Sequence, residues 1–245
     1  MLSIFDFATY PKPDDFDFIC KKKKDALDKI SLQAKEGSCD LFEYKFNCWL
    51  YGFNNRACDL KVSYAMMVYY KNYGIPDNKW HIPGDSGKGI QYFPDYAEET
   101  YAYHYWFSFY LNSCYSNYFS LIDNLFHIIN IKYDLGAEFK SYFRRTIFSK
   151  LRDIDRDMYN KFESFRKNEI YKKAQEYRND IEHNYKPDQI NSVIKDEYIN
   201  GRRITSLTIG NYVTTDEFIA NIEESIDLLA RLLDEVRDKL SFINP

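Results

Sequence analysis

The sequence predicts an all-α protein, an elongated helical bundle with extra N-terminal helices and one small β-hairpin. Turn-forming residues are scarce, with nine glycines and seven prolines among 245 residues, so many short strands are not expected. Apolar side chains recur over long segments at spacings compatible with a 3.6-residue period. A chain of this length can bury one sizeable core. We predict an N-terminal helical extension and loop at 1–94, packed as one unit on a helical domain at 95–245.

The first predicted elements lie in the N-terminal segment. Residues 1–15 are expected to be irregular because two prolines block a helix, and a polar helix is expected over 16–35. A long helix follows over 40–73 and ends near Gly74. Residues 74–94 contain four of the nine glycines and three of the seven prolines, which predicts a loop.

Residues 95–131 are expected to form a buried helix rich in aromatic side chains. Between Glu99 and Lys132 the only charged side chain is Asp123. Asparagines, serines and tyrosines are nevertheless too frequent for a segment that contacts lipid. The sequence therefore predicts a core helix and no membrane association.

The C-terminal part is predicted to alternate between helices and one hairpin. Residues 137–185 indicate one bent helix or two in tandem, and Pro187 disfavours helical geometry in the residue before it. Asn200-Gly201 between β-compatible residues is typical of a two-residue hairpin turn, which places a hairpin near 198–209. Thr214 or Thr215 then caps a last helix that continues to about residue 242.

The formal net charge of −4 conceals an uneven distribution of charge. Between residues 140 and 173 there are eleven cations and five acids, a net charge of +6, whereas the segment from 215 onward has eight acids and three cations, a net charge of −5. A local basic block of this kind favours contact with nucleic acid. Candidates for RNA contact are Lys167, Lys172 and Lys173.

Cysteine usage and the first residues suggest a compartment. The five cysteines are an odd number without CxxC spacing, so no disulfide framework is indicated. The chain does not open with the basic start and apolar run of a signal peptide. We therefore expect a cytoplasmic protein. No carboxylate or Cys/His cluster appears at metal-ligand spacing, and neither a metal nor another cofactor is expected.

The candidate catalytic residues lie in one segment at the end of a predicted helix, Arg178-Asn179-Asp180-Ile181-Glu182-His183-Asn184-Tyr185. Five residues correspond to about 140° around a helix axis, so Arg178 and His183 do not share a face, whereas Asn179 and His183 are neighbours. Arg178 and His183 of one helix are therefore poorly placed to contact the same phosphate. Two such helices across a twofold axis would do better, which favours a homodimer with a composite site.

These residue types suit cleavage of RNA by its own 2′-hydroxyl, which gives a 2′,3′-cyclic phosphate. His183 can act as general base or acid near neutral pH. Arg178 can hold the non-bridging phosphate oxygens, and Asn179 can orient His183 or contact the phosphate. The competing interpretation is that Arg178 pairs with Glu182 or Asp180, while His183 merely ends the helix.

At these residues the sequence resembles the HEPN superfamily, small all-α domains that include many metal-independent ribonucleases of toxin–antitoxin, abortive-infection and CRISPR systems. Arg178, Asn179 and His183 match its Arg-polar-x3-His signature position by position, and Tyr185 matches the extension Arg-x4-His-x-Tyr. The resemblance covers about 95–242. It implies a dimeric, metal-independent endoribonuclease, a toxin or defence effector with RNA as substrate. It also implies that a partner nucleotidyltransferase, acting as antitoxin, can modify Tyr185.

Other residues and functions stay open at this point. Asp123 and His127, four apart, could form an oriented acid–base pair that supports the site, or a hydrogen-bonded pair in the core. His104 is expected to pack rather than to stack on a base, and Tyr185 could close an apolar stripe. The alternative functions are a non-catalytic HEPN-like dimer that binds nucleotide or RNA, and a helical protein-interaction module.

Overall fold

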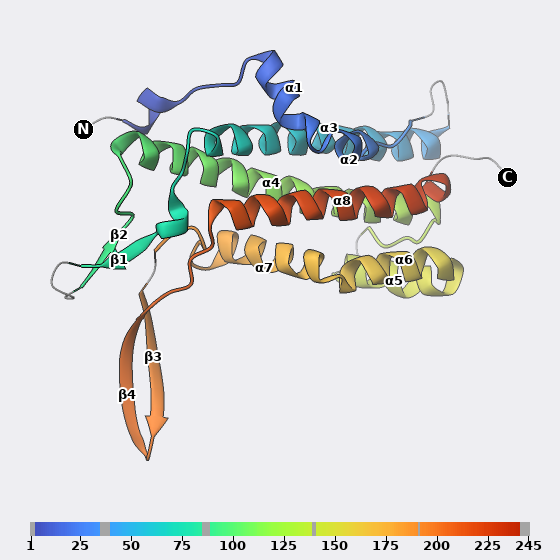
Figure 1. The fold of residues 1–245 in the computed structure, drawn as a ribbon. Coiled ribbons are helices and arrows are strands. Elements are labelled where there is room, and N and C mark those ends of the chain that lie inside the picture. The colour runs from blue at the N-terminus through green and yellow to red at the C-terminus, as the bar shows by residue number, and fades with distance from the viewer. Residues whose placement is uncertain (1–2, 35–39, 85–88, 139–140, 191, 241–245) are drawn as a thin grey trace.

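The computed structural model describes residues 3–34, 40–84, 89–138, 141–190 and 192–240. The described helices are α1 (Pro13–Lys21), α2 (Lys24–Lys29), α3 (Leu41–Lys71), α4 (Glu98–Lys132), α5 (Phe143–Ile154), α6 (Arg156–Lys167), α7 (Glu169–His183) and α8 (Thr215–Leu240). Short 3-10 helices are η1 (Ile4–Phe7) and η2 (Asp77–Lys79). Strands are β1 (His81–Pro83), β2 (Ile90–Tyr92), β3 (Ser192–Ile199) and β4 (Arg202–Ile209). The predicted all-α bundle is confirmed (Figure 1).

The bundle is built along its two longest helices, α3 and α4, which lie side by side, with α8 packed on α4 (Figure 1). Both helices follow the predicted ranges to within three residues. The nearly charge-free stretch of α4 is buried as predicted, and Phe107, Tyr115 and Tyr118 are each 0% exposed. Burial of each such ring contributes about 1.5–3 kcal/mol relative to exposure. None of the described helices is long and apolar enough to cross a membrane.

The N-terminal segment differs from the single helix expected over 16–35. Pro13 occupies the first turn of α1, where its missing N–H removes no helical bond. It therefore begins a helix and does not block one. The chain breaks at Lys22 and Lys23, and α2 follows. Ion pairs fasten this segment to α8: Lys22–Glu223 at 2.6 Å, Lys23–Asp227 at 2.6 Å and Lys29–Asp234 at 2.7 Å.

The segment 74–94, predicted as a loop, contains η2 and a short antiparallel hairpin in which β1 pairs with β2. Asp77 of η2 is 1% exposed. Its carboxylate accepts hydrogen bonds from the N–H and hydroxyl of Thr215, at 2.7 and 3.0 Å, and from the Tyr212 hydroxyl at 3.1 Å. These bonds fasten the segment to the start of α8.

Residues 143–183 form three helices, where the sequence predicted one bent helix or two. Asp155 and Asn168 make the breaks, because each caps the helix that follows it. Asp155 accepts a hydrogen bond from the Met158 N–H at 3.0 Å, and Asn168 accepts one from the Ile170 N–H at 2.9 Å. Short polar side chains offer the backbone this alternative to continuous helix. Helix α7 is therefore a separate helix of 15 residues.

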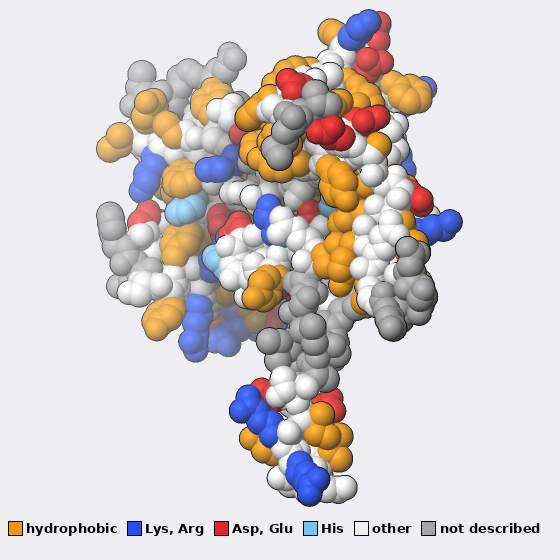
Figure 2. Space-filling view, turned by 90° about the vertical axis from the view of Figure 1, so that its left-hand side faces the viewer, with side chains coloured by type: hydrophobic (Ala, Val, Ile, Leu, Met, Phe, Trp, Pro, Cys, Tyr) orange, Lys and Arg blue, Asp and Glu red, His pale blue; other side chains and the backbone are white. Residues whose placement is uncertain are grey.

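The predicted hairpin exists and is longer than predicted. Strands β3 and β4 pair antiparallel from residue 192 to residue 209, whereas the sequence placed the hairpin near 198–209. The φ angles of Asn200 and Gly201 are +51° and +75°, as a type I′ turn requires. The hairpin extends from the body as an arm that carries basic, acidic and hydrophobic side chains (Figures 1 and 2). The exposed side chains are Tyr198, Ile199, Arg202, Arg203 and Ile204.

Helix α8 begins where the sequence predicted. Thr214 and Glu217 form a capping box, in which the Thr214 N–H donates to the Glu217 carboxylate at 2.9 Å and the Glu217 N–H donates to the Thr214 hydroxyl at 3.3 Å. Its apolar face enters a core cluster whose members run from Leu27 to Leu240. These members come from both predicted segments, 1–94 and 95–245.

Candidate functional site at the end of helix α7

Packing of α7 fixes where the Arg178–Tyr185 motif lies. The buried face of α7 consists of Tyr171, Ala174, Tyr177 and Ile181. The Tyr177 ring lies 6.2 Å from that of Tyr115 on α4 and 4.8 Å from that of Phe218 on α8, centroid to centroid. This contact sets the rotation of α7. The motif therefore lies at the carboxyl end of the helix, beside its buried face.

The Arg178 guanidinium is held by its own helix. Nη2 lies 2.7 Å from Oε2 of Glu182, and Nη1 donates to Oδ1 of Asn179 at 3.3 Å. Asn179 therefore positions Arg178 in this structure. No described hydrogen bond joins Asn179 to His183. The Arg178 Nε is buried and has no hydrogen-bond partner within the described part of the chain. Leaving a buried N–H without an acceptor costs free energy. A bound ligand that brings an acceptor to the Arg178 Nε would therefore be stabilised there.

His183 is the last residue of α7, and its side chain is 65% exposed. Asn184 leaves helical geometry, with φ of −124° and ψ of −155°. The imidazole Nε2 lies 3.7 Å from the same Glu182 oxygen that contacts Arg178. His183 can thus be reached by a large substrate. Around the motif, as across the described residues generally, no group of three or more His, Cys, Asp or Glu is placed to hold a metal ion.

Glu182 therefore links Arg178 and His183 within one chain. The competing interpretation, an Arg178–Glu182 pair with His183 ending the helix, describes the single chain correctly. A partly exposed pair at this spacing contributes only about 0.3–0.5 kcal/mol, so a phosphate that accepts two hydrogen bonds from the guanidinium can replace the carboxylate. Tyr185 does not close the apolar stripe, because it is 77% exposed.

Asp123 and His127 are not joined to each other. Asp123 makes an ion pair with Arg144 of α5. The His127 ring is stacked between Trp49 and Phe143, with centroid distances of 3.9 and 4.3 Å. No described hydrogen bond connects the Asp123 carboxylate with the His127 imidazole. Neither the oriented acid–base pair nor the hydrogen-bonded core pair is present.

His127 is also far from the motif. Tyr115 of α4 contacts Tyr177, near the motif, whereas Phe119 contacts Tyr171, so α4 and α7 run in opposite directions. His127 lies twelve residues beyond Tyr115, about 18 Å along α4. Burial lowers the pKa of His127. The structure therefore does not bring this histidine to the candidate site.

The three lysines proposed for RNA contact pair with nearby carboxylates. These pairs are Lys167–Glu163 at 3.0 Å, Lys172–Glu169 at 2.6 Å and Lys173–Glu176 at 3.8 Å. The lysine side chains are at least 49% exposed. Exposed pairs of this kind are weak and screened by salt, so each lysine can exchange its carboxylate for a phosphate.

A more strongly basic surface lies between α5 and α6, near the amino end of α7. It is a hollow of about 600 Å³ that gathers four arginines around one acid. The lining residues are Arg144, Arg145, Arg152, Arg166, Phe148, Ser149, Tyr159 and Glu163. These arginines belong to the basic block that the sequence shows between residues 140 and 173. The turn between α5 and α6 brings them together on one surface.

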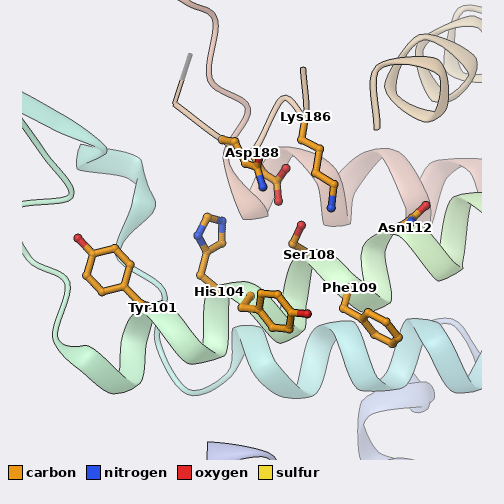
Figure 3. A pocket seen from close by; sticks show the side chains of 9 residues that line it. Tyr101, His104, Ser108, Phe109, Asn112, Lys186 and Asp188 are labelled. Atoms are coloured by element: carbon orange, nitrogen blue, oxygen red, sulfur yellow. The ribbon is translucent and has the colours of Figure 1, made fainter. Parts of the chain in front are cut away.

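A polar cluster next to the motif was not predicted. Lys186 and Asp188, which follow α7, lie across from His104 of α4 (Figure 3). His104 packs against Phe93 and Tyr96, as expected for a packing residue, and its Nε2 also lies 3.5 Å from the Tyr212 hydroxyl. The sequence signal was slight: two charged residues around Pro187, immediately after the motif.

The half-buried position of His104 gives a testable pH dependence. Burial lowers the pKa of His104 from its usual 6.5, while Asp188 and Asp77 oppose the shift. The unfolded chain therefore binds this proton more tightly, and the stabilisation present above pH 6.5 is lost as pH falls toward the folded pKa. We expect a lower urea midpoint at pH 5.5 than at pH 7.5, and His104→Gln should reduce the difference. The exposed-site variant His183→Gln is the control; equal pH dependence in His104→Gln and wild type would contradict the assignment.

Comparison with known proteins agrees with the helical fold and with the resemblance to HEPN domains. Residues 49–240 match the Cthe2314-like HEPN family. The matched range begins inside α3 and contains α4, α7 with its motif, and α8. No curated protein and no solved structure matches the chain. HEPN domains are often metal-independent ribonucleases. Since the match spans most of the 245 residues, this chain belongs to the Cthe2314-like HEPN family.

Proposed function

We propose that this HEPN protein is a metal-independent endoribonuclease that cleaves RNA to a 2′,3′-cyclic phosphate and a 5′-hydroxyl. The main support is the position of Arg178 and His183 on the exposed end of one helix, both within 3.7 Å of a single Glu182 oxygen. An anionic oxygen can therefore contact both side chains. A phosphate oxygen of RNA carries the same charge as this carboxylate oxygen and can take its place.

The reaction assigns a task to each residue. The 2′-oxygen forms a bond to phosphorus while the bond to the 5′-oxygen breaks; the 2′-hydroxyl loses a proton and the leaving oxygen gains one. A single imidazole cannot accept the proton of the 2′-hydroxyl and donate a proton to the leaving oxygen at the same moment. In a twofold dimer, His183 of each chain can take one role. Arg178 stabilises the charge on the non-bridging oxygens, and Asn179 holds the guanidinium through its 3.3 Å contact.

The basic surfaces suggest a path for the RNA. Helix α7 has 15 residues, so its ends are about 22 Å apart. The arginine-lined hollow lies near its first end, Lys172 and Lys173 lie on its first turns, and the motif lies at its last turn. At about 3.4 Å per nucleotide, the rise of a base-stacked strand, this length corresponds to at most roughly six nucleotides. Lys167, Lys172 and Lys173 are proposed to contact the phosphates along it.

The partners proposed for this chain are a second copy and an antitoxin. HEPN domains typically dimerise and bind RNA, and a twofold pair of α7 ends supplies the second histidine. A toxin or phage-defence role follows from the Arg-x4-His-x-Tyr motif. Tyr185 is 77% exposed, so a modifying nucleotidyltransferase can reach its hydroxyl. The bulky charged product would lie two residues from His183 and would obstruct RNA.

The product of the reaction tests the proposal. We expect the purified protein to cleave single-stranded RNA in EDTA and to leave a 2′,3′-cyclic phosphate, detected by mass spectrometry. An RNA with 2′-deoxy residues should resist cleavage because it lacks the nucleophile. The His183→Ala protein, purified in the same way, controls for contaminating nucleases. A 3′-hydroxyl product, or cleavage that stops in EDTA, would contradict the proposal.

A second function is favoured by one observation. The Arg178–Glu182 pair at 2.7 Å neutralises the guanidinium, as suits a dimer that binds nucleotide or RNA without cutting it. Tight, salt-dependent RNA binding without cleavage by the wild-type protein would favour that function. A helical protein-interaction module, in contrast, would show no salt-dependent RNA binding.

A further inference from the structure

A pocket of about 240 Å³ adjoins the carboxyl end of α7 (Figure 3). One wall is α4, and the other is the segment that follows the motif. The side chains that matter here are Tyr101, His104, Ser108 and Phe109 from α4, and Lys186 and Asp188 from the opposite wall. Pockets for drug-sized ligands have about 300–1,000 Å³, so this smaller pocket suits one ring system.

Asp188 is the unusual residue of the pocket. It is 2% exposed, and both carboxylate oxygens are buried without a hydrogen-bond partner in the described structure. Burial of an unpaired carboxylate is strongly unfavourable, and almost all buried polar atoms in proteins are paired. In Figure 3, Asp188 and Lys186 point toward His104 and Ser108 across the pocket. The two oxygens therefore form an acceptor pair that lacks donors.

The mouth of the pocket is aromatic. Tyr101, Tyr105 and Phe109 are spaced four residues apart on α4, so they form one stripe along the helix. They are 51%, 48% and 50% exposed. Exposed aromatic side chains of this kind stack on unpaired nucleobases. The pocket thus joins a flat apolar rim to a buried pair of acceptors.

We propose that this pocket binds a guanine base of the RNA. The inference rests on the proposed ribonuclease function and adds a base preference to it. The Watson–Crick edge of guanine carries two adjacent donors, N1–H and the 2-amino group, and one carboxylate can accept from both. Adenine, cytosine and uracil each place an acceptor beside their donor on this edge, which the carboxylate would repel. Lys186 and Ser108 supply donors for the remaining acceptors of the base.

The pocket is close enough to the motif to select the cleavage position. Asp188 follows His183 by five residues, so even a fully extended chain would separate their Cα atoms by at most about 17 Å. Lys186 lies between the two. A base bound by Asp188 therefore belongs to a nucleotide near the phosphate at His183 and Arg178, and cleavage is expected close to a guanosine.

Binding measurements on His183→Ala protein test the base preference without relying on cleavage. The probes are fluorescein-labelled hexauridylates in which one central uridine is replaced by guanosine, inosine or adenosine. We expect the guanosine probe to bind about tenfold more tightly than the adenosine probe. Inosine lacks the 2-amino group and should bind with intermediate affinity. All three probes are compared on one protein whose pocket residues are unchanged.

Adding Asp188→Asn to the His183→Ala protein should remove the preference. The guanosine and adenosine probes should then bind within about twofold of each other. Asp59→Asn, at an exposed position on α3, should leave the tenfold preference unchanged. Because Asp188 is unpaired, the midpoint of thermal unfolding should not fall in Asp188→Asn. A large fall in that midpoint would assign Asp188 a structural role and overturn the proposal.

The outcomes separate this inference from the proposed nuclease. Wild-type protein that cleaves RNA, together with equal binding of the guanosine and adenosine probes, would overturn the guanine site and leave the nuclease in place. A guanine preference that depends on Asp188, with no cleavage by wild type, would support the site and contradict the nuclease.

Discussion

Replacing His183 with alanine is expected to lower RNA cleavage by about 10²–10⁴-fold, which is the usual contribution of general acid–base catalysis. The side chain is 65% exposed, so the free energy of unfolding should change by no more than about 0.5 kcal/mol. Arg178→Ala should lower cleavage by about 10²–10³. Arg178→Lys keeps the charge but loses the planar fork of donors, and should recover only part of the loss.

The measurement is the rate of cleavage of a labelled RNA at saturating enzyme, with the fold checked by circular dichroism. His81→Ala is a matched control, because His81 is an exposed histidine on β1, outside α7. Its activity should equal that of wild type. Near-wild-type rates in purified His183→Ala and Arg178→Ala would refute the assigned roles.

Mixed dimers test the shared site. Wild-type and His183→Ala proteins, unfolded together in equal amounts and refolded, should form heterodimers. Each heterodimer retains one His183, so one of the two proton transfers loses its histidine, and cleavage should fall to about a quarter of that of the same total amount of wild-type protein. A fall to only about half, as independent sites in each chain would give, would contradict a site to which both chains contribute.

The second large effect is expected at Asp77, which is 1% exposed and far from the motif in sequence. Asp77→Ala should lower the free energy of unfolding by about 3 kcal/mol, since two buried donors on Thr215 and one partly buried donor on Tyr212 lose their acceptor. Total stability is about 5–15 kcal/mol for proteins generally, so this is a large fraction. Urea denaturation at pH 7.5 measures it.

Two variants make this result interpretable. Asp77→Asn retains one acceptor oxygen and should lose less stability than Asp77→Ala. Asp216→Ala removes a neighbouring acid whose side chain is 74% exposed, and should change stability by less than about 0.5 kcal/mol. If Asp77→Ala were as stable as Asp216→Ala, the bonds between η2 and the start of α8 would not hold this part of the fold together.

Much of the fold could be predicted because the signals are local. The ranges of α3 and α4 follow from hydrophobic periodicity, and the turn at Asn200-Gly201 follows from the backbone angles that these residues tolerate. The breaks at Asp155 and Asn168 were missed. Both residues are flanked by sequence compatible with helix, and the competition between a cap and a continuing helix is decided by packing.

The candidate site was predictable only in part, for a similar reason. Arg178, Asn179 and His183 lie within six residues, so their proximity is set by one helix. Asp123 and His127 have a spacing that permits contact, yet the His127 ring takes the stacking position between Trp49 and Phe143. His104 and Asp188 are distant in sequence and meet only when the segment after α7 folds back on α4.

The β3–β4 arm has a practical consequence. Each strand has eight residues, so the turn at Asn200-Gly201 stands about 25 Å from the base of the hairpin. The exposed side chains near this turn make no contribution to the main core. A fluorophore or affinity tag inserted there should leave the helices undisturbed. It would provide an attachment point for following association of two copies, or capture of RNA, by energy transfer.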